Sequence, residues 1–138
     1  MMGTVYEEIT LKNEGDKIRV REGLIKETDM RQTTVRSIVD TGAGTLIIND
    51  AVQKALGLRT EHLHDSTLAN GETVICKIAE AVEVFWKDRS MVCRPWVVPG
   101  AKEVLLGSIP LEEMDLIVDS KNQKLVGAHG DQPLGHIY

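Results

Sequence analysis

The stretch 37–45 constrains the fold of this chain more than any other. Two strand-forming residues, Ile38 and Val39, run directly into Asp40, and a hydroxyl residue and then Gly42 follow. An ionised carboxylate at the end of a buried strand is costly unless other groups compensate for it. A glycine lets the backbone turn sharply and present its N–H groups. The pattern predicts a strand and a tight loop that holds an acid where a second acid can share it.

Residues 40–43 read Asp-Thr-Gly-Ala, and this stretch resembles the signature of aspartic proteases. Two later stretches extend the resemblance to the small, single-motif, retropepsin-like type of bacteria and archaea. Residues 68–73 resemble the flap of that family, and residues 104–107 resemble its apolar-apolar-Gly element. The resemblance runs from about Val35 to about Gly127.

The resemblance implies an all-β fold with two short helices, arranged as a closed, retropepsin-like acid-protease β-barrel with one lobe per chain. It also implies a role for each matching residue: Asp40 as the catalytic residue, Thr41, Gly42 and Ala43 as the active-site loop, Ala69, Asn70 and Gly71 as the substrate-binding flap, and Leu106 and Gly107 as the supporting strand. No metal or cofactor belongs to this expectation.

The chemistry of that family needs two carboxylates that share one proton. The chain carries only one candidate motif, because Asp119-Ser120 is followed by Lys121 and Asp65-Ser66 is followed by Thr67. The chain is also too short for two lobes. We therefore expect an aspartic endopeptidase that acts as a homodimer on an extended peptide or protein, with one Asp40 from each copy.

Composition narrows the class of partner. The chain has 138 residues and a formal charge of −5, from 16 basic and 21 acidic residues. This balance argues against a nucleic-acid binder, which needs a basic face. No apolar run approaches the ~18 residues that span a bilayer. The sequence around Met1 shows no signal peptide, so we expect a cytoplasmic protein without a membrane partner.

One domain is expected over residues 1–127, followed by an extended C-terminal tail over 128–138. The hydrophobic content is 42% with only 4% aromatic residues, so the core must be largely aliphatic. The two cysteines, Cys76 and Cys93, are expected to be buried thiols, with a disulfide as the alternative.

Periodicity and turn residues predict the remaining elements. The expected strands are 4–11, 17–21, 33–39, 46–48, one long bent strand at 76–86, 90–94, 96–98 and 103–107, with a loop or edge element over 22–32. A helix over 51–56 is expected between an Asn49 or Asp50 cap and Gly57, and a second helix over 108–114 with Ser108 as its cap. Hairpins are expected over 67–75, turning at Asn70-Gly71, and over 116–127.

Two pairs of side chains admit two interpretations. His62 and His64 have the spacing of a metal-binding pair on a strand, but no third ligand accompanies them, so the favoured interpretation is two solvated loop histidines. Trp86 and Trp96 are interpreted as core or interface residues rather than as ligand platforms.

The chain departs from the family pattern at Gly44, where many relatives carry a hydroxyl or an acid. Two other interpretations of the sequence stay open. The first is a dimeric module on the same fold that grips an extended peptide without cutting it, since a fold does not fix a function. The second is an unrelated small β-barrel in which Asp40 only caps a turn.

Overall fold

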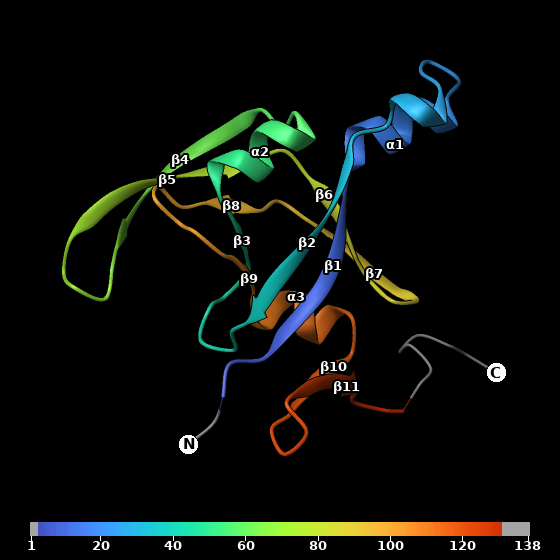
Figure 1. Cartoon of the computed structure of the whole chain (residues 1–138). Coiled ribbons are helices and arrows are strands. Elements are labelled where there is room, and N and C mark those ends of the chain that lie inside the picture. The colour runs from blue at the N-terminus through green and yellow to red at the C-terminus, as the bar shows by residue number, and fades with distance from the viewer. Residues whose placement is uncertain (1–2, 131–138) are drawn as a thin grey trace.

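The computed structural model describes residues 3–130 and shows a mostly β protein with a few short helices (Figure 1). The elements in chain order are β1 (Tyr6–Asn13), α1 (Glu14–Arg21), the 3-10 helix η1 (Glu27–Asp29), β2 (Gln32–Val39), β3 (Leu46–Ile48), α2 (Asp50–Leu56), β4 (Thr60–Thr67), β5 (Thr73–Ala79), β6 (Val82–Trp86), β7 (Arg89–Cys93), β8 (Trp96–Val97), β9 (Val104–Leu106), α3 (Ser108–Glu113), β10 (Leu116–Asp119) and β11 (Lys124–Gly127).

Nine strands form one sheet in the order β4-β5-β8-β3-β9-β2-β1-β6-β7, and β10 pairs with β11 in a separate sheet. Strand β9 lies between two strands that flank the 40–45 loop, parallel to β2 and antiparallel to β3. Within residues 3–130 the outer strands β4 and β7 do not pair with each other, so the expected closure of the barrel is not confirmed. The expected all-β class is confirmed at the coarser level of a mostly β fold.

The core is aliphatic, as the scarcity of aromatic residues requires. Its fully buried members come from both halves of the sheet and from α2, and they include Ile9, Leu11, Leu46, Ile48, Leu56, Val82, Val84, Val97 and Leu106. Trp86 also belongs to this cluster. Cys76 is buried and Cys93 partly buried, both are free thiols, and burial raises the pKa of Cys93 to about 12.

The strand expected over 17–21 is wrong, because these residues belong to α1. The strict alternation of apolar and charged residues there fits a strand, but the preceding residues start a helix. The side chain of Asn13 accepts a hydrogen bond from the Asp16 N–H at 3.0 Å and caps the helix. Acids lie in its first turn and Arg19 and Arg21 in its last turn, which suits the helix dipole.

The single strand expected over 76–86 is also wrong, because it divides at Glu80. Strand β5 pairs with β4 and β8 near one edge of the sheet, whereas β6 pairs with β1 and β7 near the opposite edge. The Glu80 carboxylate accepts a 2.7 Å hydrogen bond from the Arg59 N–H, and the Glu80 N–H donates to the Arg59 carbonyl at 2.9 Å. These bonds replace the regular ladder at that point and redirect the chain.

The polar segment that contains His62 and His64 is a strand and not a loop, because β4 pairs with β5 along most of its length. Both histidines are exposed. Within residues 3–130 no group of three His, Cys, Asp or Glu side chains could hold a metal ion. None of the helices in this part of the chain is long and apolar enough to cross a membrane.

Several local predictions are confirmed. The Asn49 side chain accepts from the Val52 N–H at 2.9 Å and caps α2, which ends at Gly57 in the left-handed conformation with φ 61°. The 116–127 hairpin pairs in the expected register from Leu116 with Gly127 to Asp119 with Lys124. The loop over 22–32 is confirmed apart from η1 and the start of β2 at Gln32.

Buried Arg89 secures the segment around the β10–β11 hairpin. Its guanidinium donates to the carbonyls of Met114 at 3.0 Å, Asp115 at 2.7 Å and Gly130 at 2.7 Å. His129 also contacts the Asp115 carboxylate at 2.7 Å. The first three residues of the expected tail are therefore tied to the domain, the rest of it lies outside the described residues, and the boundary at residue 127 stays a prediction.

Candidate active site

The loop that follows β2 is held by its backbone. The Asp40 N–H donates to the Leu106 carbonyl of β9 at 3.0 Å, and the Ala43 N–H donates to the Asp40 carbonyl at 3.1 Å. The chain then enters β3 at Leu46, on the other side of β9. The first bond anchors Asp40 at the carboxyl end of its strand, and the second closes a turn over residues 40–43.

The Asp40 carboxylate is half-buried and lightly bonded. Its Oδ1 accepts one hydrogen bond, from the Gly42 N–H at 2.9 Å, and no other hydrogen bond to this carboxylate is present among residues 3–130. A carboxylate has about four lone-pair sites, so most of its accepting capacity is unused. It borders a hollow of about 500 Å³ lined by Gly3, Thr4, Val5, Ile38, Val39, Thr41, Val118 and Ser120. The acid thus faces space in which a further polar group can reach it.

Gly107 allows β9 and α3 to approach this loop closely. A Cβ atom at this position would collide with the carbonyl oxygen of Thr45 and would lie 2.6 Å from that of Ala43. The helix cap expected at Ser108 is wrong, because Gly107 is the N-cap residue and no side chain caps the helix. The loop itself supplies the acceptors instead. The Ser108 N–H donates to Ala43 at 2.9 Å and the Ile109 N–H donates to Gly44 at 3.3 Å.

The hairpin of β4 and β5 projects from the sheet (Figure 1). The hairpin prediction is confirmed, but its turn is not a two-residue Asn-Gly turn, because only Gly71 has a positive φ, at 88°. The Gly71 N–H donates to the Leu68 carbonyl at 2.9 Å, and the Asn70 side chain accepts from the Glu72 N–H at 2.9 Å. Ala69, Asn70 and Gly71 are exposed at its tip, and no hydrogen bond joins them to Asp40 in the described part of the chain.

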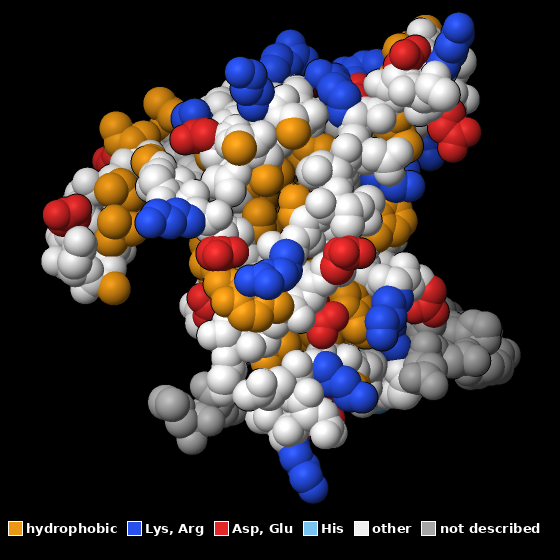
Figure 2. All heavy atoms as spheres, in the orientation of Figure 1, with side chains coloured by type: hydrophobic (Ala, Val, Ile, Leu, Met, Phe, Trp, Pro, Cys, Tyr) orange, Lys and Arg blue, Asp and Glu red, His pale blue; other side chains and the backbone are white. Residues whose placement is uncertain are grey.

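The two faces of this hairpin differ. Ser66 and Cys76 face a pocket, whereas Leu63 and Ile75 occupy the alternate positions and are exposed at 68% and 56%. Apolar side chains accordingly show on this hairpin in the space-filling view (Figure 2).

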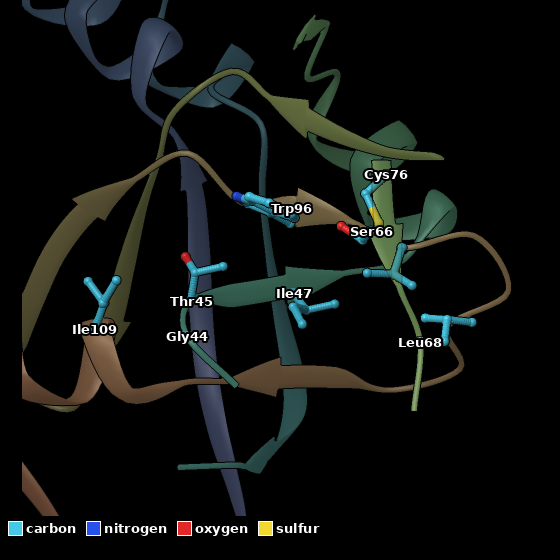
Figure 3. Close-up of a pocket in the computed structure, with 9 residues that line it drawn as sticks. Gly44, Thr45, Ile47, Ser66, Leu68, Cys76, Trp96 and Ile109 are labelled. Atoms are coloured by element: carbon cyan, nitrogen blue, oxygen red, sulfur yellow. The ribbon is translucent and has the colours of Figure 1, made fainter. Parts of the chain in front are cut away.

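The pocket lies between the active-site loop, β3, β8 and the hairpin (Figure 3). Its volume is about 510 Å³, and its lining is mostly apolar: Gly44, Thr45, Ile47, Ser66, Leu68, Cys76, Trp96, Val98 and Ile109. The Trp96 ring lies against His64 of β4, with ring centroids 4.8 Å apart. The hairpin and the 44–45 end of the loop therefore border one cavity, although they are far apart in sequence.

Residues 27–109 match the family model described as aspartyl protease. The chain belongs to the aspartyl protease family. The match covers the Asp40 loop, the hairpin and β9 together, so the alternative of an unrelated small barrel is wrong. A comparison with curated protein sequences finds no significant match.

Three solved structures resemble the chain at low sequence identity. The retroviral protease-like domain of Ddi1 from Leishmania major is 14% identical, with a TM-score of 0.58, and the match covers 99% of this chain and 100% of that domain. EIAV protease, in a complex with an inhibitor, is 19% identical, with a TM-score of 0.48, and the match covers 81% of this chain and 86% of the protease chain. A retropepsin-like aspartic protease from Rickettsia conorii is 16% identical, with a TM-score of 0.43, and the match covers 86% of this chain and 90% of that protease. The first of these likenesses shows a shared retropepsin-like fold.

For this family member, the sequence located the loop and its support but not the pocket. Thr41, Gly42 and Ala43 surround Asp40 in one loop, and Leu106 and Gly107 touch that loop from β9. The predicted flap residues 69–71 lie at the tip of the hairpin, and no hydrogen bond joins them to Asp40 among the described residues. Trp96 is half-buried, lines the pocket and does not belong to the core cluster, so its interpretation as a core residue is wrong, while an interface role stays a prediction. No local pattern predicts that Trp96 lines a pocket, because the walls of this pocket come from segments far apart in the sequence.

Proposed function

We propose that this protein is an aspartic endopeptidase that cleaves an extended peptide or protein segment as a homodimer, with one Asp40 from each copy. The observation that supports this proposal most is the hydrogen bonding and the surroundings of the Asp40 carboxylate. In a chain of the aspartyl protease family, the motif carboxylate is anchored through its backbone, accepts one hydrogen bond, and borders a hollow of about 500 Å³.

A second copy is required because a single carboxylate cannot perform this chemistry. Two carboxylates close together cannot both ionise, so one keeps a proton while the other acts as a base. A two-fold axis that passes beside Asp40 brings the same residue of both copies together, since a two-fold contact joins identical surfaces. The pair then titrates as a unit, and neither apparent pKa belongs to one residue.

The reaction follows from these two protonation states. The ionised Asp40 takes a proton from a bound water, and the oxygen of that water attacks the carbonyl carbon of the scissile bond. The protonated Asp40 of the second copy donates a hydrogen bond to the carbonyl oxygen. The carbon–nitrogen bond then breaks as the amine leaves with a proton from the pair. No acyl-enzyme forms, because water is the nucleophile.

The surroundings of Asp40 suit contact with a second copy. The β10–β11 hairpin is a separate two-stranded sheet, and its Leu116 and Leu125 pack into the core, so it presents an ordered surface beside Asp40. Val118 and Ser120 of this segment line the hollow beside Asp40, and Ile117 is 52% exposed. Association through the side of this hairpin that faces the hollow would bring the two Asp40 side chains together, whereas Ile117 alternates with Val118 and lies on the other face.

The alternative is a dimeric module that binds a peptide without cutting it. One observation favours it: Gly44 offers no hydroxyl or acid to join the hydrogen bonds around the acid pair. The pocket of about 510 Å³ is also complete within one chain, so binding does not require the acid pair.

The test combines solution mass with cleavage. We expect sedimentation at micromolar concentration to give twice the chain mass of 15.3 kDa, and apolar peptides to be cleaved. Asp40→Asn should abolish cleavage but retain peptide binding. Asp88→Asn makes the same chemical change at an exposed turn residue and should leave cleavage unchanged. A monomer at every concentration would contradict the shared-acid mechanism, and a dimer that binds but never cleaves would favour the binding module.

A further inference from the structure

Glu7 of β1 is an acid at a position of the strand that faces the protein core. Ile9 and Leu11, which follow it on the same face of β1, are buried, and Glu7 itself is partly buried. Within residues 3–130 no basic side chain forms an ion pair with Glu7. A carboxylate that leaves water is costly unless other groups bind it. An apolar residue here would continue the alternation of the strand, so strand formation does not require this acid.

Two hydrogen bonds satisfy the Glu7 carboxylate, and their donors belong to different sheets. Oε1 accepts from the indole N–H of Trp86 in β6 at 2.9 Å, and Oε2 accepts from the backbone N–H of Leu125 in β11 at 3.2 Å. Strand β6 belongs to the nine-stranded sheet, whereas β10 and β11 form the separate hairpin (Figure 1). Among residues 3–130 the bond to Leu125 is the only hydrogen bond between the nine-stranded sheet and either strand of this hairpin.

Glu7 is also tied to the strand that precedes Asp40. The buried Ser37 hydroxyl donates to the Glu7 carbonyl at 2.8 Å, and Ser37 lies opposite Glu7 where β1 pairs with β2. On the hairpin side, Leu125 lies opposite Val118, and Val118 lines the hollow beside Asp40. Glu7 thus connects the strand that leads to Asp40 with the hairpin that forms another wall of the same hollow.

Apolar packing by itself would not fix where this hairpin stands. Leu116 and Leu125 belong to the core cluster, but the burial of apolar surface is non-directional. Buried Arg89 binds backbone carbonyls just before and after the hairpin, at residues 114, 115 and 130. The hydrogen bond from Leu125 to Glu7 requires a particular distance and angle, so it can define the position of the strands themselves.

We infer that Glu7 is a positioning residue, whose carboxylate sets the place of the β10–β11 hairpin beside Asp40 and so shapes the surface on which a second copy docks. This inference rests on the proposed function, because it treats the hollow beside Asp40 as part of the homodimer contact. Glu7 acts through Leu125 and takes no part in the reaction itself. An acid at a core-facing position thereby gains a reason that strand formation does not supply.

Two substitutions of Glu7 test this role. Glu7→Gln keeps the shape of the side chain but replaces one acceptor oxygen with an NH2 group, so either Trp86 or Leu125 then faces a donor. Glu7→Met removes both acceptors, so the bond to Leu125 is lost in this variant whichever way the glutamine turns. Glu8→Gln and Glu8→Met are the matched controls, since Glu8 is the next residue of β1, points to the opposite face and is exposed.

The position of the hairpin is measured in the isotope-labelled full-length protein by amide chemical shifts and hydrogen exchange. In Glu7→Met the amide resonances of residues 116–127 should shift. The Leu125 amide should exchange about tenfold faster than in wild type, because its hydrogen bond is lost. Both Glu8 variants should leave these amides unchanged.

The consequence for the site is measured by association and cleavage. Sedimentation of the folded protein gives the dissociation constant of the dimer, and cleavage at saturating protein concentration gives kcat per dimer. We expect Glu7→Met to raise the dissociation constant about tenfold and to leave kcat within about twofold of wild type, because the Asp40 loop itself is unchanged. A residue that only stabilised the fold would lower the unfolding midpoint without changing the dissociation constant of the folded protein.

The outcomes separate this inference from the proposed function. Hairpin amides that change in Glu7→Met, in a protein that is monomeric at every concentration, support the placement of the hairpin by Glu7 and contradict the homodimeric endopeptidase. A cleaving dimer in which Glu7→Met leaves either the hairpin amides or the dissociation constant unchanged supports the endopeptidase and overturns the inference. A lower unfolding midpoint with unchanged hairpin amides also overturns it, because Glu7 would then serve stability alone.

Discussion

Two aspartates in this chain follow strands of the same sheet and have opposite surroundings. The Asp16 carboxylate is buried, and it accepts hydrogen bonds from the Arg31 side chain at 2.8 and 3.0 Å, from the Arg31 N–H at 3.0 Å and from Arg19 at 2.8 Å. The Asp40 carboxylate is more accessible and accepts one hydrogen bond, from Gly42.

The two carboxylates differ in how many lone pairs remain free to bind a substrate or a water. The lone pairs of Asp16 are occupied, and its hydrogen bonds with Arg31, more than any other factor, lower the pKa of its carboxyl to about 2. Such an acid stabilises the α1 segment and has no capacity left for a substrate. Asp40 is fixed through its backbone, by the Asp40 N–H and by the fit of Gly107, so its carboxylate can stay under-bonded. The catalytic candidate is therefore the acid whose position does not depend on its own side-chain bonds.

The largest expected effect is on activity and comes from Asp40→Asn. If the carboxylate is the shared acid and base, cleavage should fall by at least about 10³-fold. The free energy of unfolding should change by less than about 0.5 kcal/mol, because the amide oxygen of Asn can still accept the one hydrogen bond from the Gly42 N–H. Peptide cleavage and urea unfolding measure the two quantities. A large loss of stability would show that Asp40 resembles Asp16 more than we argue.

The next largest effect is expected from Gly107→Ala. The added methyl would meet the backbone of Ala43 and Thr45, which cannot move without displacing the loop. We expect a loss of about 3 kcal/mol or more in the free energy of unfolding, together with loss of cleavage. Urea unfolding measures the first. Gly44→Ala is the matched control, since the same methyl meets open space, and its stability should stay within about 0.5 kcal/mol of wild type.

Asp16→Asn should reverse the pattern of Asp40→Asn. The buried carboxylate of Asp16 is lost, but Arg19 and Arg31 are themselves 41% and 47% exposed and can turn to water, so we expect a loss of about 1.5–3 kcal/mol in the free energy of unfolding. At temperatures where the variant is folded, cleavage per folded molecule should be unchanged. Arg19→Gln removes only one of the bonds and should cost less. Equal stability of Asp16→Asn and wild type would contradict the structural role of this acid.

The smallest effect is a pH dependence of stability. The pKa of Asp16 is lowered from 3.8 to about 2 on folding, so its contribution is fully present above pH 4 and is lost as the pH falls toward 2. Linkage gives up to about 2 kcal/mol over this interval. Urea unfolding of wild type and Asp16→Asn between pH 2 and 6 measures it. The difference between the two proteins should shrink at low pH, and a constant difference would contradict the assignment to Asp16.

Local sequence determined a substantial part of this protein. The Asp40 loop, the Asn49 cap with Gly57 at the end of α2, and the two hairpins all depend on residues whose preferences act over a few positions. Patterns at this range were readable because a turn or a helix cap favours particular residues whatever surrounds it.

Only the tertiary structure decided the rest. The segment 17–21 alternates like a strand, but it is a helix whose Asp16 is paired with Arg31, fifteen residues away. The contact of Glu80 with Arg59 divides one expected strand into two. The pocket joins Gly44, Leu68 and Trp96 from three distant segments. The physical reason is that a partner distant along the chain leaves no trace in local periodicity, and its contribution exists only once packing brings the two groups together.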